Sequence, residues 1–322
     1  MTQITEIRVK DLDTQEFIKI KSEEISELVG SGFAINALSG GVDSSAVTML
    51  GHKALGSRLK TYFINNGIMR KDEPQQIVSI FEQLGVKVEI IDAQDKFFKA
   101  LKGLTDPEEK REAITQTFYK DVFAKLVRES KAKYLLQGTI LTDVDETVAG
   151  IKRQHNVFLQ LGIDPQEAFG YKIIEPLVQL RKDGVRKLAE ALGLPEPFFK
   201  RMPFPGPALA ARIIGEVTFE KIEVVRIATS VIEEELKNTN AFQYMAILHQ
   251  DRVTGMRNGK RDFGLQIEIR CWDSIDARHA KPTRLSFDKL DNLSNRMVTE
   301  VPGVVSVTYN ITSKPPSTME AI

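Results

Sequence analysis

The chain has a single cysteine, Cys271, among its 322 residues. One cysteine excludes an internal disulfide and a C-x-x-C redox or zinc pair, and it favours a reducing compartment. The 44 basic residues equal the 44 acidic ones, so the formal net charge of zero gives no indication of a nucleic-acid-binding surface. No apolar run approaches the ~18 residues of a membrane-spanning helix. The first thirty residues are charged and show no secretory signal, so we expect a cytoplasmic protein without a membrane partner.

Short β-rich runs alternate with helical segments over the first two hundred residues. The β-rich runs are Phe33–Leu38, Thr61–Asn65, Lys87–Ile91 and Tyr134–Gln137. The helical segments are Thr14–Leu28, with Thr14 as its expected cap, Ala46–Leu55, Pro74–Leu84 and Glu108–Ser130. This alternation predicts an α/β fold with a doubly wound parallel sheet. Because such sheets bind ligands beyond the carboxyl ends of their strands, we expect three polar loops, at 39–45, 65–67 and 137–139, to converge on one crevice.

A proline-rich stretch divides the chain. Pro203-Phe204-Pro205-Gly206-Pro207 can continue neither a helix nor a sheet. We therefore expect a first domain over 1–202, a linker over 203–211 and a second domain over 212–322. The second domain has expected helices at Phe219–Leu236 and Phe287–Val301 and expected strands at Tyr244–His249, Leu265–Cys271 and Val304–Tyr309. This pattern predicts a small α+β domain.

The segment Ser39-Gly40-Gly41-Val42-Asp43-Ser44-Ser45 lies between a β-rich run and a helix. Glycines let the backbone approach a ligand closely, and successive N–H groups at a helix N-terminus form an anion-binding concavity, so the segment is suited to hold phosphate. It is not a Walker A loop, because Asp43 precedes Ser44 where that motif has lysine. A carboxylate among phosphates requires a divalent cation, so these residues predict a nucleotide polyphosphate with Mg²⁺. The alternative is a strand-to-helix turn with a Ser or Asp N-cap.

The segment 39–45 resembles the signature of the PP-loop ATP pyrophosphatases, which cleave ATP between the α- and β-phosphates. Over nearly the whole chain, further segments resemble one family within that group, GMP synthase. They are Asn66-Gly67-Ile68-Met69-Arg70, Leu104–Arg111, Gln137-Gly138-Thr139, Ile151-Lys152, His155-Asn156-Val157, Pro203–Pro207, Gly215-Glu216-Val217-Thr218 and Lys314-Pro315-Pro316. The resemblance implies a PP-loop, adenine nucleotide alpha hydrolase-like fold followed by a dimerisation domain, and hence a homodimer. It also implies a carbon–nitrogen ligase of purine biosynthesis, which aminates XMP to GMP through an adenyl-XMP intermediate and releases AMP and pyrophosphate.

The resemblance also implies residue roles. The positions implied to hold ATP are Ser39, Gly40, Gly41, Val42, Asp43, Ser44, Ser45, Gly138 and Thr139. The positions implied to lie near Mg²⁺ are Asp43, Asp143, Glu146 and Asp183. The implied catalytic residues are Lys152 and His155, on a mobile lid, and Lys182. The positions expected around XMP are Arg70, Gly206, Lys314, Thr318 and Glu320.

Several of these residues have a structural alternative. Arg70 begins a charged run that is suited to solvent, and Lys314 lies in a proline-rich tail. Lys182 and Asp183 stand at a charged helix start, where Asp183 is suited to an N-cap. His155 could serve only a hydrogen bond within its loop. We expect His52, His249, His279 and Cys271 to be structural.

The chain departs from the family pattern in its lid and near its acceptor positions. Gln154 replaces the first histidine of the lid, Phe158-Leu159 replaces a glycine pair, and Gly184 replaces a glutamate. The chain reads Asn258-Gly259 where the family has Gly-Asp, and it ends Glu320-Ala321-Ile322 in place of Glu-Trp-Glu. These departures leave two alternatives for the molecule that ATP adenylates: XMP, or a different acceptor used by a divergent paralogue. A non-catalytic ATP-binding sensor is the third possibility.

Other PP-loop families explain fewer residues. Enzymes that thiolate tRNA usually depend on several cysteines or a basic surface, and asparagine synthetase has a nucleophilic cysteine where this chain has Thr2. NAD synthetase would not explain the Pro203–Pro207 segment or the Lys-Pro-Pro tail. Cys271 lies in a strand-like run without a nucleophile elbow, so the chain carries no glutaminase. We therefore expect a separate glutamine amidotransferase subunit to supply ammonia, with ATP and XMP as the small-molecule partners.

Overall fold

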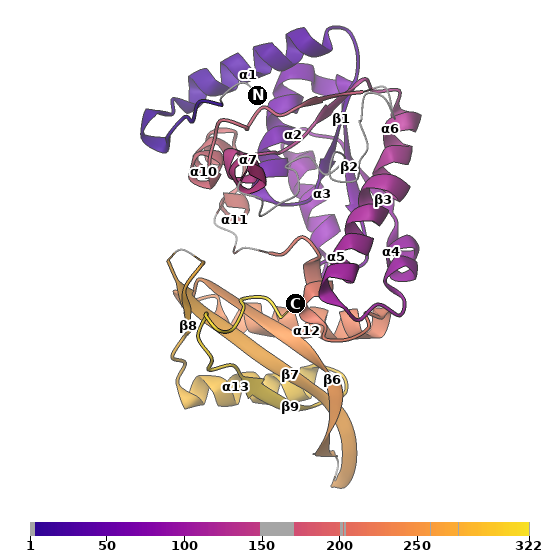
Figure 1. Cartoon of the computed structure of the whole chain (residues 1–322), viewed down its shortest axis with the longest axis vertical. Helices are drawn as coiled ribbons and strands as arrows, with labels where there is room; N and C mark the ends of the chain where they lie inside the picture. The colour runs from indigo at the N-terminus through magenta and orange to yellow at the C-terminus, as the bar shows by residue number, and fades with distance from the viewer. Residues whose placement is uncertain are drawn as a thin grey trace. The chain divides into compact units, whose positions relative to one another are not determined.

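The computed structural model describes residues 4–148, 171–199, 202, 204–257, 259–275 and 277–321. The chain divides into two compact units, whose elements are labelled in Figure 1. Unit 1 comprises Met1–Asn65, Pro74–Asp92 and Gln116–Arg201, and unit 2 comprises Asn66–Glu73, Ala93–Thr115 and Met202–Ile322. The sequence-based division near residue 202 did not anticipate that two earlier segments belong with unit 2. Among the described helices, none is long and apolar enough to cross a membrane.

Unit 1 contains a sheet of five parallel strands in the order β3-β2-β1-β4-β5. The strands are β1 (Ala34–Leu38), β2 (Leu59–Asn65), β3 (Val88–Asp92), β4 (Tyr134–Leu136) and β5 (Lys172–Ile174). In register, Ala34 of β1 lies opposite Leu59 of β2 and Tyr134 of β4. The chain proceeds from β1 outward to β3 and then returns to β4, so the strand order reverses between β1 and β4. The α/β prediction with a parallel sheet is confirmed, and β5 is an additional strand.

Helices cover this sheet. The described helices of unit 1 are α1 (Thr14–Val29), α2 (Val42–Leu55), α3 (Glu73–Gln83), α6 (Ala124–Ser130), α7 (Leu141–Val148), α10 (Lys182–Ala191) and α11 (Glu196–Phe199), with short turns η1 (Val9–Asp11) and η2 (Gly56–Arg58). Helix α2 packs against α1, α10 and α11, and Figure 1 shows α6 on the other side of the sheet. The buried Leu38 of β1 lies opposite the buried Phe63 of β2 in register, and α2, with its buried Leu50, packs against both strands. This packing fixes the turn between β1 and α2, which lies at the reversal of strand order.

Two details of the sequence-based helices were wrong. Asp13 rather than Thr14 caps α1, because its carboxylate accepts hydrogen bonds from the N–H groups of Gln15 and Glu16. The helical spacing of Phe17, Ile25 and Leu28 predicts that all three face inward, but Leu28 is 56% exposed. The helix expected over 108–130 is confirmed, and it runs from α5 (Pro107–Gln116) through an unexpected π-helical segment η3 (Thr117–Phe123) to α6. The π-helical segment widens the turn by one residue and changes the direction of the side chains that follow it.

Unit 2 has a four-stranded sheet that packs against helices. Its strands are β6 (Gln243–Arg257), β7 (Lys260–Ser274), β8 (Ala280–Pro282) and β9 (Val304–Tyr309), and its helices include α4 (Gln94–Leu101), α12 (Phe219–Leu236) and α13 (Phe287–Glu300), with the turn η4 (Ala208–Arg212). Strands β6 and β8 pair antiparallel to β7, and β9 pairs parallel to it. Helix α12 packs against β6, α13 against β9, and the two helices against each other. The α+β prediction for this part of the chain is confirmed.

Side-chain contacts explain why residues 66–73 and 93–115 belong with unit 2. Arg226 of α12 donates hydrogen bonds to the carbonyl oxygens of Gly67 at 2.7 Å and Met69 at 2.9 Å. The buried Lys110 of α5 donates to the carbonyl of Ile213 at 2.9 Å. Both contacts join residues more than one hundred positions apart, and the local pattern of the sequence carries no sign of them.

Candidate active site

A cavity of about 320 Å³ lies in unit 1 at the carboxyl ends of β1 and β4. Its lining residues come from β1 and the glycine turn, from α2, from β4 and the turn after it, from η3 and from α7. They are Asn36, Ala37, Ser39, Gly41, Asp43, Ser44, Val47, Phe118, Tyr119, Phe123, Leu135, Leu136, Gln137, Gly138, Thr139 and Asp143. Two of the three loops that we expected at one crevice line this cavity. The third, at 65–67, does not, and most of it belongs to unit 2.

The glycine turn is held in one conformation by its own serines. Gly40 has φ of 75°, in the left-handed region that favours glycine, whereas Gly41 is extended and is the N-cap of α2. Ser44 Oγ donates to the carbonyl of Gly41 at 3.0 Å and lies 2.9 Å from Ser39 Oγ. No side chain caps α2, so the alternative of a Ser or Asp N-cap is wrong. The first N–H groups of α2 are therefore left for a ligand, as in other anion-binding helix N-termini.

Asp43 is the charged residue of the turn, and it pairs with Lys182 of α10. Lys182 Nζ donates to Asp43 Oδ2 at 2.6 Å. Asp43 Oδ1 is buried and has no hydrogen-bond partner among the described residues. Burial raises the pKa of the Asp43 carboxyl above its usual range, and the charge and hydrogen bond of Lys182 oppose this increase. An unpartnered buried carboxylate oxygen beside a phosphate-binding turn is suited to coordinate a hard cation.

The other metal positions expected from the sequence differ from Asp43. Asp143 lines the same cavity, and its charge contributes to the raised pKa of Asp43. Asp183 is exposed, accepts a hydrogen bond from the N–H of Gly184, and lies in the first turn of α10 rather than at its N-cap, which is Arg181. Glu146 is on α7, but its side chain lies outside what the structure describes. No cluster of three or more metal-ligating side chains occurs in the described ranges.

Lys152 and His155, the two expected lid residues, lie outside the described residues, as do all positions from 149 to 170. Their contribution to the site therefore remains a prediction. Lys182 is the one expected catalytic residue whose side chain is described.

Gly138 and Thr139 bring the turn after β4 against the glycine turn. A Cβ atom at Gly138 would lie 3.1 Å from the carbonyl carbon of Asp43 and 3.2 Å from the nitrogen of Ser44. The absence of a side chain at Gly138 thus permits two backbones to meet. Thr139 Oγ1 donates to Glu175 Oε1 at 2.6 Å. No sequence pattern indicated a role for Glu175, because this carboxylate follows the short strand β5.

A buried polar network lies beneath the glycine turn. Asn36 of β1, which is 1% exposed, donates from Nδ2 to Thr48 Oγ1 at 2.6 Å. Thr61 Oγ1 of β2 donates to Asn36 Oδ1 at 2.8 Å, and Thr48 Oγ1 donates to the carbonyl of Ser44 at 2.8 Å. Satisfied buried networks of this kind fix one local geometry. We infer that Asn36 positions the turn, a role that sequence reasoning missed.

An aromatic cluster forms the apolar side of the cavity. Phe118, Tyr119 and Phe123 of η3 have ring centroids 4.9 to 6.5 Å apart. Burial, reinforced by the charge of Asp143, raises the pKa of Tyr119 to about 12. A polar turn that is suited to phosphate and an aromatic wall that is suited to a planar ring thus line the same cavity.

The expected acceptor residues all lie in unit 2, and two of them are joined through residues that sequence reasoning missed. Glu320 Oε1 accepts a hydrogen bond from Gln243 Nε2 at 2.9 Å, and Glu320 Oε2 lies 3.6 Å from Nε of the buried Arg212. The Arg212 guanidinium lies 4.7 Å from the ring centroid of Phe204. The Arg70 guanidinium lies 3.9 Å from the same centroid. A row of contacts therefore connects Arg70 to Glu320 through Phe204 and Arg212.

The remaining acceptor positions lie on the tail or in the proline-rich segment. Lys314 Nζ donates to the carbonyl of Ala277 at 2.8 Å, and its backbone pairs with Ala280 of β8. Thr318 is exposed, and its Oγ1 donates to the carbonyl of Glu320 at 2.7 Å. Gly206 is exposed and has open space where a side chain would be. Arg70 Nε also pairs with Glu233 Oε1 of α12 at 2.7 Å.

Known families match both parts of the chain. A family model described as NAD synthase matches residues 14–210, and one described as GMP synthase C terminal domain matches residues 230–321. A relative from Archaeoglobus fulgidus, a subunit of glutamine-hydrolyzing GMP synthase, is 46% identical over 309 residues, which cover 96% of this chain and 99% of the relative. The chain belongs to the GMP synthase family. Relatives with the same name from Pyrococcus horikoshii and Methanocaldococcus jannaschii are 45% and 42% identical, each over 96% of this chain and 99% of the relative.

Membership in this family explains the two family models together. The NAD synthase model covers the glycine turn and the parallel sheet of unit 1, which is the part that PP-loop families share. The GMP synthase model covers the whole second sheet and the Lys-Pro-Pro tail, which NAD synthetase would not explain, whereas the Pro203–Pro207 segment lies within the NAD synthase match. The resemblance to the GMP synthase family is thus confirmed.

Proposed function

We propose that this protein is the synthetase subunit of a two-subunit GMP synthase and converts XMP, ATP and ammonia into GMP, AMP and pyrophosphate. The observation that supports this most strongly is the end-to-end similarity to the GMP synthase relatives, combined with a glycine turn whose Asp43, paired with Lys182, lines the cavity of unit 1. The C2 oxygen of XMP attacks the α-phosphorus of ATP, and pyrophosphate leaves. Ammonia then attacks C2 of the adenylate, AMP leaves with the former C2 oxygen, and GMP and a proton are released.

The residues of unit 1 hold ATP and stabilise the departing pyrophosphate. The N–H groups of the glycine turn and the hydroxyl groups of Ser39 and Ser44 donate hydrogen bonds to phosphate oxygens. Lys182 supplies a positive charge where negative charge increases during the first step. When bound, Mg²⁺ offsets phosphate charge, and Asp43 and Asp143 are the carboxylates that would hold it. No side-chain nucleophile is needed, because XMP itself attacks ATP.

The residues of unit 2 hold XMP. Arg70 and Lys314 are the donors for its phosphate, since a guanidinium binds phosphate in a bidentate manner and an ammonium binds it as a point charge. The Glu320 carboxylate is the acceptor for N–H groups of the xanthine ring. Arg212 and Gln243 hold that carboxylate in one orientation. A fixed orientation lets the Glu320 carboxylate distinguish xanthine from other bases by the position of the N–H groups.

Ammonia reaches the adenylate from a separate glutamine amidotransferase subunit. The names of the relatives, which describe one subunit of a glutamine-hydrolyzing enzyme, support this. The state of Cys271, the only cysteine, also supports a separate source of ammonia, because this thiol is not suited to hydrolyse glutamine. Cys271 is 1% exposed within β7, and burial raises the pKa of its thiol. Such a thiol is a poor nucleophile. We also propose a homodimer through unit 2, where Met256 and Phe263 of the long β6–β7 pair are 69% and 61% exposed.

Oxygen-18 at C2 of XMP tests the chemistry. The purified chain is incubated with labelled XMP, ATP, Mg²⁺ and ammonium, and AMP is analysed by mass spectrometry. We expect one labelled oxygen in each AMP formed with GMP. Unlabelled AMP would contradict adenylation of the C2 oxygen, and AMP formed only with some other acceptor would indicate a divergent paralogue. ATP binding without any AMP would support a sensor.

A further inference from the structure

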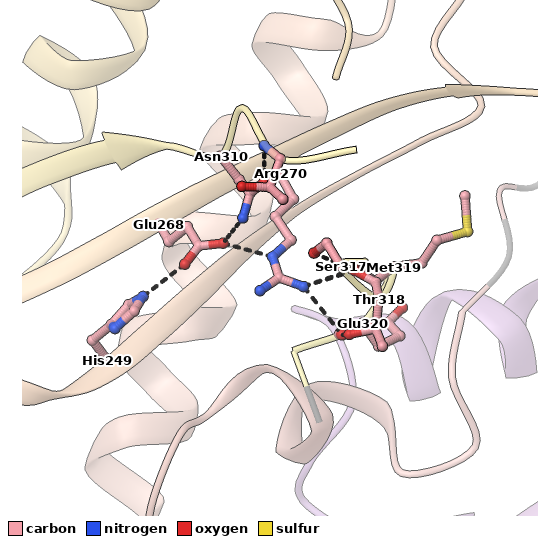
Figure 2. Close-up of polar contacts among 9 residues, drawn as sticks. His249, Glu268, Arg270, Asn310, Ser317, Thr318, Met319 and Glu320 are labelled. Atoms are coloured by element: carbon pink, nitrogen blue, oxygen red, sulfur yellow. Dashed lines mark hydrogen bonds and ion pairs between the residues drawn. The ribbon is translucent and has the colours of Figure 1, made fainter. Parts of the chain in front are cut away.

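Over residues 317–320 the C-terminal tail pairs with no strand of the described part of the chain, yet one arginine holds its backbone. Arg270 Nη1 lies 2.9 Å from the carbonyl oxygen of Thr318, 3.4 Å from that of Met319 and 3.1 Å from that of Glu320 (Figure 2). One Nη1 group has two hydrogens, so it shares them among three acceptors. Met319, between the two proposed XMP residues, is 9% exposed and packs in a core cluster with Met245 and Trp272.

Arg270 is itself held by a carboxylate. It lies on β7 with a side chain that is 11% exposed, and its Nε donates to Glu268 Oε1 at 2.6 Å. Glu268 also accepts a hydrogen bond from Asn310 Nδ2 at 3.0 Å, and its other oxygen lies 2.8 Å from His249 Nε2, as Figure 2 shows. Burial tends to raise the pKa of Glu268, but the hydrogen bonds from Arg270, His249 and Asn310 outweigh it and hold the pKa below its usual range. Glu268 therefore stays ionised and fixes the guanidinium.

The side chain of Glu320 and the backbone of the tail are thus held by different residues. Arg212 and Gln243 contact the side chain of Glu320, whereas the contacts of Arg270 with the tail are to backbone carbonyl groups alone. Carbonyl contacts do not recognise a ligand, but they determine where the side chains of Thr318 and Glu320 lie. A tail that is ordered before a ligand arrives does not lose conformational entropy on binding, so the ligand binds more tightly.

We propose that Arg270, held by Glu268, is a positioning residue that orders residues 318–320 for the acceptor nucleotide. The inference rests on the proposed function for the identity of that acceptor, but not for the ordering itself. Arg270 acts on the equilibrium between ordered and released tail, and it touches neither ATP nor the reacting atoms. Its removal therefore weakens XMP binding and leaves the chemistry of bound XMP unchanged.

Arg270→Gln is the test variant, and Arg296→Gln is its matched control. Arg296 also makes several contacts in unit 2, with Glu234, Glu235 and Glu300, but these lie on helices α12 and α13. We expect Arg270→Gln to raise the KM for XMP about tenfold or more, with the KM for ATP within about twofold and kcat within about threefold of wild type. We expect Arg296→Gln to leave all three near wild type. Thermal unfolding of both variants shows whether either has lost its fold.

Hydrogen exchange of the tail amides, measured by mass spectrometry without any nucleotide, is the second readout. We expect the amides of 318–321 to exchange about tenfold faster in Arg270→Gln and at the wild-type rate in Arg296→Gln. Normal exchange in Arg270→Gln would overturn the proposal. If the wild-type protein does not aminate XMP, the proposed function fails, whereas the exchange experiment still decides whether Arg270 orders the tail.

The double variant Glu268→Gln/Arg270→Gln excludes a further explanation, in which the tail is released only because Glu268 loses its main partner. If the carbonyl contacts of Arg270 order the tail, the double variant exchanges as fast as Arg270→Gln. If the uncompensated carboxylate is the cause, the double variant recovers slow exchange and a low KM for XMP, which would overturn the proposal. Glu268→Gln alone should give an intermediate KM for XMP. The amide oxygen of the glutamine can still accept a hydrogen bond from Arg270 Nε, but the attraction between opposite charges is lost.

Discussion

Lys182 Nζ and Asp43 Oδ2 are 2.6 Å apart, although 139 positions separate these residues in the chain. The contact joins the first turn of α10 to the first turn of α2. It supplies the positive charge that a Walker A loop would take from a lysine within its own motif. The partial neutralisation of Asp43 in turn allows a carboxylate to lie where phosphate groups are expected.

Replacement of Lys182 should change both the rate and its pH dependence. Burial already raises the pKa of Asp43, and Lys182 lowers it, so in Lys182→Met the pKa of Asp43 rises further. Because ionised Asp43 is the active form, the acid limb of the pH profile for pyrophosphate release should move to higher pH. The loss of a charge that stabilises the leaving group should lower kcat about 10²- to 10³-fold. Lys187→Met is the control, because Lys187 lies on the same helix but its Nζ donates a hydrogen bond to the carbonyl oxygen of Leu12. An acid limb at the wild-type position would contradict this role of Lys182.

Gly138→Ala should disturb the glycine turn without unfolding the protein. The new Cβ would lie within 3.3 Å of three atoms of Asp43 and Ser44, two of which are backbone atoms. We expect the KM for ATP to rise about tenfold or more, because a shift of the turn misaligns the phosphate donors. Gly184→Ala is the matched control, since its Cβ would meet only ordinary contacts at 3.5 Å or more inside a helix. That control should be as active as wild type and up to about 1 kcal/mol more stable. Equal kinetics for the two variants would refute the close-approach role of Gly138.

Lys110 should make stability depend on pH in the alkaline range. Burial, with a smaller contribution from the charge of Lys221, lowers the pKa of Lys110 from 10.5 to about 8. Between these values the unfolded chain binds more protons than the folded one, so the free energy of unfolding increases with pH. The wild type should therefore gain about 1 to 3 kcal/mol over Lys110→Met between pH 8 and pH 10, as denaturant titrations would measure. Lys237→Met, at an exposed position, should show no such trend relative to wild type. A flat difference for Lys110→Met would contradict the lowered pKa.

The parts of the fold that depend on nearby residues could be predicted from the sequence. Helix α12 begins and ends at the expected residues, because Thr218 caps it and its apolar positions recur at helical spacing. The glycine turn could be recognised for the same reason, since its glycines, serines and aspartate are consecutive. The parallel sheet followed from the alternation of strands and helices, which constrains topology strongly.

Contacts between distant residues could not be predicted in this way. Arg226 holds the loop at 67–69 from 157 and 159 positions away, and this contact assigns that loop to unit 2. Glu175 meets Thr139 only because β5 lies beside β4, and β5 is too short to show a pattern. Arg270 reaches the tail across about fifty positions. None of these pairings has a local signature, since their geometry depends on the finished fold.

Pyrophosphate release that depends on XMP is the most direct measurement of the proposed activity. The purified chain is supplied with ATP, Mg²⁺ and ammonium, with and without XMP, and pyrophosphate and GMP are quantified together. We predict release only when XMP is present, with one GMP formed for each pyrophosphate. Release that is independent of XMP, or XMP-dependent release without GMP, would contradict the assignment of this chain as a GMP-forming ligase.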